Sequence, residues 1–381
     1  MTPDRRSILA LFSLAFGLRI LYAVIVGTNP DFVANIYTYD FLIANKIAAG
    51  ANWWSEPISP RAPGYQLLLG GLFSLFGVHQ WLVIIMHAFF GGVVAFLLYR
   101  IGEKSLGPSV GLFAALWFSI YVQEAQFTSI LLRDVTVIML ATFTCYLLIR
   151  YAHTMRGTLW TALAYAVLLH FDPQFLLFLP VITLYFLLYA TRHRLLSVQY
   201  GFLFLGTVLV LLVPWTVRNY RVYGDPIPIA LEATQYYQPI RSTIKTATDP
   251  GGNEGEYWRN SVEYWRVMRV RDHVVPVANG PDQVLPAWSL RHNAISLATY
   301  GVLLPFLLVG VWLSIRNRSR TTLVLSVAVA GMYLIRAFYG GSPHSRLPAE
   351  PLIILLAFYA VTHIGRECRN RKARADTNAG A

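Results

Sequence analysis

Hydrophobic residues occur along this chain in long runs that are separated by short polar stretches. A run of roughly 20 apolar residues can cross a lipid bilayer as an α-helix. The break Phe171-Asp172-Pro173 between two of the runs is weak. The pattern predicts an all-α integral membrane protein with about ten transmembrane helices, near residues 7–27, 80–100, 108–123, 131–150, 157–170, 174–190, 197–216, 293–315, 321–338 and 349–366.

The composition agrees with this pattern and excludes a soluble globular domain. Of the 381 residues, 56% are hydrophobic and 13% are charged, and the mean hydropathy is +0.49. The first apolar run, residues 7–26, is too long for a cleaved signal peptide and has no small-residue cleavage site, so we predict a signal anchor. The net charge of +12 is compatible with a nucleic-acid-binding protein, but the positions of the charges argue against that function.

The basic residues predict the orientation in the membrane. If the N-terminus is cytoplasmic, the inner ends of the predicted helices hold 16 Lys and Arg, and the short outer segments hold only Lys46, Arg61 and Arg346. Such an asymmetry is the rule for cytoplasmic loops. We therefore expect both termini in the cytoplasm and the segments 28–79 and 217–292 outside, in a multi-pass protein of the cell inner (plasma) membrane.

The two outer segments carry most of the polar residues outside the predicted spans. In the first, residues 40–49 and 65–76 are predicted to be helices that lie on the membrane, because each is too short to span it. The second is predicted to cap the helical bundle. The chain is thus expected to divide into 1–27, 28–79, 80–216, 217–292, 293–366 and 367–381, the last being a basic cytoplasmic tail.

Ionisable residues from distant parts of the sequence fall at one level of the predicted bundle. Arg133 and Asp134 stand inside the apolar run 127–149, where charge is costly and a functional role is the default interpretation. Arginines bind phosphate and a carboxylate can accept a proton from a nucleophile. Arg19 and Asp172 are instead interpreted as a buried structural arginine and a capping residue. The candidates at the outer level are Asp31, Asp40, Arg61, Glu124, Asp134, Asp172, Arg218, Arg221, Arg336, His344 and Arg346.

Three short motifs, in this order, resemble those of bacterial GT-C glycosyltransferases. They are Arg61-Ala-Pro-Gly-Tyr65 with an apolar run to Phe76-Gly77, Pro214-Trp-Thr-Val-Arg-Asn-Tyr220 with Tyr223-Gly224, and Ser345-Arg-Leu-Pro-Ala-Glu-Pro351. The most similar group contains the relatives of dolichyl-phosphate-mannose protein mannosyltransferases and of the aminoarabinose transferase of lipid A. The similarity extends over most of residues 7–366.

This resemblance implies a membrane enzyme that takes a sugar from a polyprenyl-phosphate donor on the extracytoplasmic face, by a single inverting displacement. The acceptor would be a glycolipid, a wall polymer or a protein. In the family a second carboxylate stands at the outer start of the fourth span, and the matching residue here is Asp134. Arg218 and Arg346 match basic positions that face the lipid phosphate. Arg61 matches the basic residue that precedes the interfacial helix in the family. As our own hypothesis, we add donor binding by Arg61, Arg221, Arg336 and His344, and substrate positioning by Arg133, Tyr65 and Tyr220.

The first-loop acid of the family is displaced in this chain. The family pattern places it at the position of Ile36, whereas the nearest carboxylates here are Asp40, one turn later, and Asp31. Asp40 is our first candidate for the base and Asp31 the second. No metal-ligand motif, P-loop or dinucleotide fingerprint is evident, so no cofactor is required, although some relatives use a divalent metal.

Other functions remain compatible with the sequence. A transporter or flippase for lipid-linked saccharides would use the same arginines, but it predicts ionisable residues throughout the membrane depth, where only Arg19 is found. A polysaccharide polymerase or ligase would require a diphosphate donor. A structural membrane subunit without activity is a further alternative, because the acid is displaced.

Overall fold

The computed structural model describes most of the chain as helix. Every apolar run predicted from the sequence contains a helical segment. The described residues are 5–27, 39–55, 61–129, 132–191, 193–229, 264–265, 273–275, 283–285, 294–317, 319–339 and 343–379.

The first half of the bundle contains α1 (Arg5–Gly27), α3 (Tyr39–Ala48), α4 (Pro63–Phe76), α5 (Gln80–Ser105), α6 (Pro108–Ser119), α7 (Val122–Ser129), α8 (Asp134–Tyr151) and α9 (Met155–Phe171). The second half contains the helical turn η2 (Pro173–Phe178), α10 (Leu179–Tyr189), α11 (Arg194–Tyr223), η3 (Leu297–Gly301), α15 (Leu303–Asn317), α16 (Arg320–Tyr339), η4 (Pro343–Ala349) and α17 (Glu350–Ala379). Two short strands, β1 (His273–Val275) and β2 (Gln283–Leu285), pair antiparallel, with His273 opposite Leu285.

The lengths and composition of the helices confirm the prediction of an all-α integral membrane protein. Within the described residues, six helical segments are long and apolar enough to cross a bilayer, and three shorter apolar ones accompany them. The count of about ten transmembrane helices stays a prediction. The six are Ile8–Ile25, Gln80–Ser105, Asp134–Tyr151, Arg194–Tyr223, Ala294–Asn317 and Arg346–Arg374.

Small residues allow the helices to pack closely, as is usual in membrane bundles. A Cβ atom on Gly102 of α5 or on Gly111 of α6 would collide with the backbone of the other helix. Gly310 of α15 likewise lies against the backbone of Leu356 in α17. These contacts hold α5 against α6 and α15 against α17.

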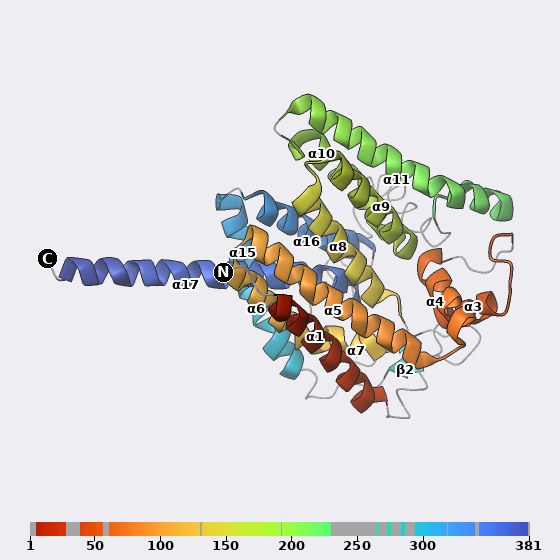
Figure 1. Ribbon diagram of the computed structural model, residues 1–381, viewed down its shortest axis with the longest axis horizontal. Helices are drawn as coiled ribbons and strands as arrows, with labels where there is room; N and C mark the ends of the chain where they lie inside the picture. Colours follow the sequence, from red (N-terminus) through yellow and green to blue (C-terminus); the bar gives the residue numbers. More distant parts are fainter. Residues whose placement is uncertain are drawn as a thin grey trace, which may run out of the picture.

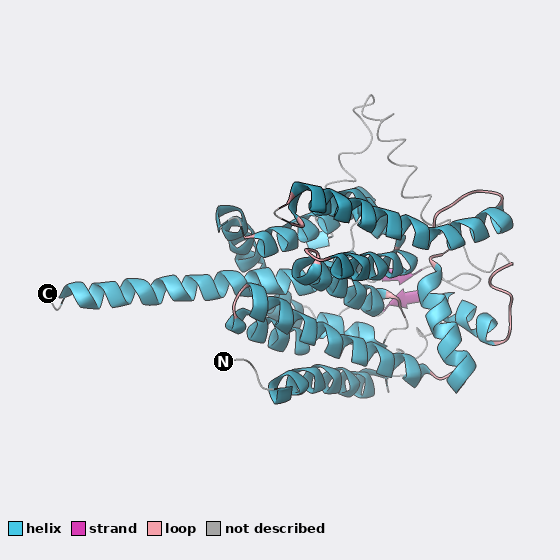
Figure 2. Cartoon of the chain, turned by 45° about the horizontal axis from the view of Figure 1, so that its top comes forward, coloured by secondary structure: helices cyan, strands magenta, loops and turns pink. Residues whose placement is uncertain are grey.

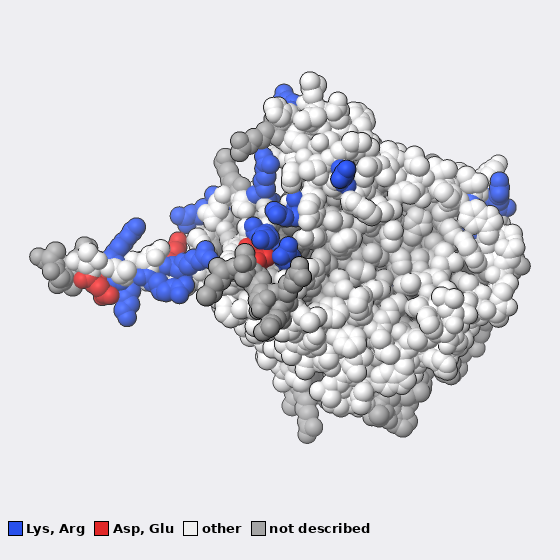
Figure 3. Space-filling model, viewed as in Figure 1, with Lys and Arg blue, Asp and Glu red and all other residues white. Residues whose placement is uncertain are grey.

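The two ends of the bundle differ in charge and structure. In Figure 1, α3 and α4 lie at one end, and α17 projects from the opposite end, where the N-terminus also lies. Figure 2 shows the pair of strands toward the end that carries α3 and α4. On the face visible in Figure 3, Lys and Arg gather along α17 and around the point where it leaves the bundle. This distribution matches the charge asymmetry read from the sequence.

The run 127–149, which contains Arg133 and Asp134, is not one helix. The helix α7 ends at Ser129 and α8 begins at Asp134, with Arg133 in its N-cap position. The charged pair therefore stands at the N-terminal end of a helix rather than in the middle of a span. Negative charge at this position is favourable, because the N-terminus of a helix carries partial positive charge.

Both helices predicted for the first outer segment are present, as α3 and α4. Pro63 occupies the first turn of α4, where its missing N–H and fixed φ are tolerated. Tyr65, Leu69 and Phe73, spaced by four residues, are buried against the bundle. Leu75 and Phe76 are 77% and 61% exposed, so the other face of α4 is also apolar, as expected of a helix in contact with lipid.

Candidate active site

The carboxylate of Asp40 is buried at the start of α3. Its residue is only 4% exposed. Gln66 of α4 donates a hydrogen bond from Nε2 to Oδ1 of Asp40 at 2.8 Å. Nη1 of Arg61 lies 3.8 Å from Oδ2, and the Arg61 side chain is 42% exposed. Both neighbours stabilise negative charge on the carboxylate, and Arg61 connects it to the surface.

A second polar pair lies beside Asp40. The hydroxyl of Tyr65 is 3.1 Å from Nε2 of His87 in α5, and Nδ1 of His87 is 3.3 Å from the carbonyl oxygen of Thr128 in α7. The two rings stack with their centroids 5.9 Å apart. Tyr65 and His87 are almost completely buried. The pair therefore links three helices through hydrogen bonds that water does not reach.

The negative charges of two acids act on the Tyr65 hydroxyl. Burial, together with the negative charges of Asp40 and Asp134, raises the pKa of Tyr65 well above its usual value. Asp134 is itself only partly buried, as is Arg133 before it. The structure thus brings Asp40, the motif residues Arg61 and Tyr65, and Asp134 from three separate places in the sequence into one electrostatic neighbourhood. Together with Gln66 and His87, we call these residues the Asp40 cluster.

Gly64 lets α4 approach the end of α9 closely. A Cβ atom at this position would lie 2.5 Å from the ring of Phe171 and 2.8 Å from the carbonyl oxygen of His170. Any larger residue would therefore push α4 away from the bundle, and Tyr65 and Gln66 with it. This packing explains why the motif has a glycine between Pro63 and Tyr65.

Arg218, near the end of α11, holds the first outer segment against the bundle. Its Nε and Nη2 donate to the carbonyl oxygen of Trp53 at 3.3 and 3.0 Å, and Nη1 donates to Oδ1 of Asn219 at 3.1 Å. The guanidinium also lies over the rings of Trp215 and Tyr223. It is 2% exposed. The predicted phosphate contact of Arg218 stays a prediction, and these groups already use much of its hydrogen-bonding capacity.

Arg346 is similarly engaged, in a buried ion pair. Its Nε donates to Oε1 of Glu350 at 2.8 Å, and both side chains are 1% exposed. Nη1 donates to the carbonyl oxygen of Tyr264 at 2.7 Å, and the guanidinium stacks 3.6 Å from the centroid of the Tyr300 ring. Its phosphate contact also stays a prediction. The observed contacts tie η4 to the second outer segment.

Glu124 adds a carboxyl group to the interior near this ion pair. It is 3% exposed, and its Oε1 has no hydrogen-bond partner within the described chain. Burial, and then the negative charge of Glu350, raises the pKa of Glu124 well above its usual value. Arg19 contributes positive charge and itself donates to the carbonyl oxygens of Ala15 and Phe118. These bonds fit the structural role expected of Arg19.

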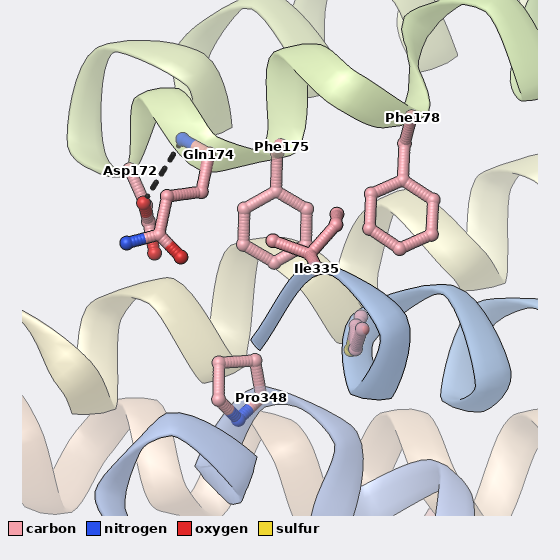
Figure 4. A pocket seen from close by; sticks show the side chains of 7 residues that line it. Asp172, Gln174, Phe175, Phe178, Ile335 and Pro348 are labelled. Atoms are coloured by element: carbon pink, nitrogen blue, oxygen red, sulfur yellow. Dashed lines mark hydrogen bonds between the residues drawn. The ribbon is translucent and has the colours of Figure 1, made fainter. Parts of the chain in front are cut away.

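A small pocket opens between η2, α16 and η4. Figure 4 shows Asp172, Gln174 and the rings of Phe175 and Phe178 in a row along η2, with Ile335 and Pro348 facing them. The carboxylate of Asp172 accepts a hydrogen bond from the backbone N–H of Gln174 at 3.2 Å, which is the capping role predicted for it. Asp172 directly follows Phe171, whose ring packs against Gly64 of α4.

The remaining predicted site residues are either exposed on α11 or outside the part of the chain that the structure describes. Arg221 is exposed at the end of α11, and Tyr220 is 60% exposed. Asp31 lies outside the described residues, and so do the side chains of Arg336 and His344. In the part of the chain that the structure describes, no group of three or more His, Cys, Asp or Glu side chains is placed to hold a metal ion.

Sequence reasoning missed Gln66, His87 and Glu350. The pairing of Glu350 with Arg346 is signalled by their spacing of four residues, because such residues face each other on a helical turn. Gln66 follows a motif residue but has no distinguishing pattern. His87 stands alone in an apolar run, where nothing in the sequence connects it to Tyr65.

Comparisons with known proteins agree with this architecture. Residues 60–217 match the family model described as dolichyl-phosphate-mannose-protein mannosyltransferase. No individual curated protein matches the chain in sequence.

Solved structures of membrane glycosyltransferases share the fold. The archaeal oligosaccharyltransferase AglB from Archaeoglobus fulgidus, in complex with an inhibitory peptide and a dolichol-phosphate, matches with a TM-score of 0.52 and 11% identity, over 97% of this chain and 52% of that chain. The apo form of the Archaeoglobus fulgidus oligosaccharyltransferase matches with a TM-score of 0.51 and 12% identity, over 98% of this chain and 52% of that chain. ArnT from Cupriavidus metallidurans bound to undecaprenyl phosphate matches with a TM-score of 0.53 and 14% identity, over 91% of this chain and 59% of that chain.

The chain is therefore a multi-pass membrane protein with the GT-C fold, and the resemblance that the three motifs indicated is confirmed. It spans between 52% and 59% of the length of these solved structures. The stretch that matches the mannosyltransferase model contains Arg61, Tyr65, His87 and Asp134. Asp40 precedes this stretch.

Proposed function

We propose that this protein is a membrane glycosyltransferase that moves a sugar from a polyprenyl-phosphate donor to an extracytoplasmic acceptor. The observation that carries the proposal is the buried Asp40, held by Gln66 and by the half-exposed Arg61 within a GT-C fold. The match of residues 60–217 to the mannosyltransferase model supports the same reaction class. The acceptor is a glycolipid, a wall polymer or a protein.

In the proposed reaction, Asp40 acts as general base. The acceptor hydroxyl or amine gives its proton to the carboxylate and forms a bond to the anomeric carbon, while the bond from that carbon to the donor phosphate breaks. The lipid phosphate leaves with the electron pair. It needs no general acid, because a phosphate monoester with a second pKa of about 6 already carries most of its charge near neutral pH. Asp31 is the alternative base.

Arg61 is the first candidate for the phosphate contact. It is the cation nearest to Asp40 with a partly exposed side chain, and positive charge beside the departing phosphate stabilises the transition state. Arg221, Arg336 and His344 are assigned supporting contacts. Because Arg218 and Arg346 are buried and hydrogen-bonded to the protein, we assign them first to fixing the two outer segments.

The pocket at Asp172 and Gln174 is a candidate for the sugar. The carboxylate and the amide suit sugar hydroxyls, and the aromatic rings that follow them along η2 suit the apolar face of a sugar ring. The negative charge of Asp172 disfavours a phosphate at this position. Both termini are assigned to the cytoplasm, since the Lys and Arg side chains gather at the end opposite α3 and α4.

The test is a transfer assay with the purified protein in liposomes. Radiolabelled monosaccharides on undecaprenyl phosphate or undecaprenyl diphosphate are supplied with lipids extracted from bacterial envelopes, and the glycosidic product is measured. We expect product from the monophosphate donor and none from liposomes without protein. Transfer from the diphosphate donor alone would indicate a polymerase or ligase, and movement of the labelled lipid across the liposome without product would indicate a flippase.

A further inference from the structure

The end of α17 extends beyond the rest of the bundle. Asn317 of α15 donates a hydrogen bond to the hydroxyl of Tyr359 at 3.0 Å, and the guanidinium of Arg366 lies over Gly107, in the turn between α5 and α6. All residues from Arg366 to Arg374 are exposed, and Figures 1 and 2 show this part of α17 projecting alone from the bundle. We call residues 366–374 the basic tail helix.

The basic tail helix carries positive charge that is only partly balanced within the chain. Oε1 of its one acid, Glu367, lies 3.3 Å from Nε2 of His363, one turn earlier on the same helix. The basic side chains make no hydrogen bond or ion pair with the residues that the structure describes. Like charges three residues apart, such as those of Arg366 and Arg369, weaken a helix. An anionic partner would therefore stabilise this segment, whose basic residues are Arg366, Arg369, Arg371, Lys372 and Arg374.

These basic side chains point to all sides of the helix. Successive residues of an α-helix are about 100° apart around its axis, so Arg369 and Arg371 point in nearly opposite directions, as do Lys372 and Arg374. A protein surface or a single phosphate ion would approach such a helix from one side. Positive charge on every side instead fits a layer of anions through which the helix passes.

The position of the basic tail helix along α17 agrees with the polar layer of a bilayer. Ile364, which is 40% exposed, is the last large apolar residue before it. With a rise of about 1.5 Å per residue, Arg366 lies about 3 Å and Arg374 about 15 Å beyond Ile364 along the helix axis. The polar layer is about 5–8 Å thick on each side of the hydrocarbon, and the field of its charges extends roughly 10 Å further.

The charges of the bundle itself support this placement. On the face that Figure 3 shows, Lys and Arg also gather around the point where α17 leaves the bundle. Lys104, at the end of α5, belongs to the same end of the molecule, because Gly107 follows it by three residues and is in contact with Arg366. The basic tail helix therefore continues a charged border that the spanning helices already form.

We propose that the basic tail helix binds the anionic headgroups of phospholipids in the leaflet that surrounds it, which in the predicted orientation is the cytoplasmic leaflet. The arginines donate charge-assisted hydrogen bonds to phosphate oxygens, for which the planar guanidinium is well suited. These contacts hold α17 at a fixed depth in the bilayer. The interaction does not depend on the proposed glycosyl transfer.

A dye on Cys368 reports directly on the lipids around the basic tail helix. Cys368 is exposed, whereas Cys145 is buried, so the full-length protein can be labelled at one site. The labelled protein is placed in nanodiscs of phosphatidylcholine that contain a trace of acyl-labelled phosphatidylglycerol or the same amount of acyl-labelled phosphatidylcholine. Energy transfer from Cys368 to each labelled lipid is measured at low and at high salt.

We expect more energy transfer to phosphatidylglycerol than to phosphatidylcholine. A basic residue near anionic lipid contributes about 1 kcal/mol, which is about fivefold in an equilibrium constant, so phosphatidylglycerol should be enriched around the basic tail helix by about fivefold or more. High salt should reduce this enrichment, because it screens exposed charges. Equal transfer from the wild type to the two lipids at low salt would overturn the proposal, whether or not the protein binds DNA added to the same nanodiscs.

Three variants test whether the charge of the basic tail helix is the cause. The triple variant Arg371→Gln/Lys372→Gln/Arg374→Gln should lose most of the enrichment, and Arg371→Lys/Arg374→Lys, which keeps the charge, should retain most of it. The matched control Asn370→Gln changes a neutral residue on the same helix and should equal the wild type. An unchanged enrichment in the triple variant, or its loss in the lysine variant, would overturn the proposal. A protein without sugar transfer would refute only the proposed function.

Discussion

Two ion pairs of this protein join an arginine to a carboxylate, and they differ in almost every physical respect. Arg61 and Asp40 are 3.8 Å apart, with the arginine side chain 42% exposed and the acid 5% exposed. Arg346 and Glu350 are 2.8 Å apart, with both side chains 1% exposed. The arginine of the first pair is open to solvent, whereas the second pair contacts Tyr264 and Tyr300.

The difference favours different roles for the two motif arginines. An ion pair with one half-exposed member contributes less to stability than a fully buried pair, and its exposed arginine can exchange partners at smaller cost. A buried pair is strongly destabilised when one member is removed, because the other charge is left without a partner. Arg61 therefore suits binding and release of an anionic group, and Arg346 suits holding the outer segments in place.

The largest effect on stability is expected from Arg346→Met. Removing the guanidinium leaves Glu350 buried and unpaired, at a cost of about 3–5 kcal/mol. The double variant Arg346→Met/Glu350→Leu should recover part of this loss. Thermal unfolding in detergent measures both. If Arg346→Met unfolds at the temperature of the wild type, the pair does not have the structural role assigned to it.

Arg61→Gln should instead affect binding and leave stability nearly unchanged. A hydrogen bond to a charged group contributes about 1.5–3 kcal/mol, so KM for the undecaprenyl-phosphate donor should rise about tenfold or more. Added salt should reduce the difference between wild type and variant. A variant with unchanged KM and lowered unfolding temperature would reverse the comparison.

Arg218→Lys distinguishes anchoring from phosphate binding at α11. Lysine keeps the positive charge but cannot make the two bonds from Nε and Nη2 to Trp53, so an anchoring role predicts a loss of about 1–2 kcal/mol with KM for the donor little changed. The unfolding temperature and KM are compared in one preparation. A large rise in KM without loss of stability would support the phosphate contact.

The smallest effect is expected from Glu124→Gln. Burial raises the pKa of Glu124 in the folded protein above its value in the unfolded chain. The unfolded state therefore loses this proton first as pH rises, and the carboxyl destabilises the fold progressively between the two pKa values. Glutamine removes the penalty, so the variant should gain a few degrees in unfolding temperature at neutral pH and less at acidic pH. Equal shifts at both would contradict this assignment.

The helices were predictable from the sequence because membrane spans and interfacial helices follow directly from the length of apolar runs. Pro63 marked the start of α4, and Asp172 marked the boundary of α9 and η2. The span predicted at 131–150 corresponds to α8 (Asp134–Tyr151), but the end of α7 at Ser129 could not be predicted, because apolar composition does not reveal where a helix stops inside an apolar run.

The site was predictable only in part. Asp40, Arg61, Tyr65 and Asp134 could be selected by their type, their motifs and the topology. Their partners Gln66 and His87 could not, because a hydrogen bond between distant helices leaves no periodic pattern in a single sequence. For the same reason, the burial of Arg218 and Arg346 was not predictable: a motif gives the residue type but not the groups packed around it.

The rate of sugar transfer by Asp40→Asn tests the central claim most directly. Asparagine has nearly the same shape but cannot accept the proton, so the account predicts a loss of about 10²–10⁴ in kcat. Asp31→Asn serves as the comparison, and Asp376→Asn, on the exposed tail of α17, as the control. Transfer at the rate of the wild type by Asp40→Asn would contradict the assignment of Asp40 as the base.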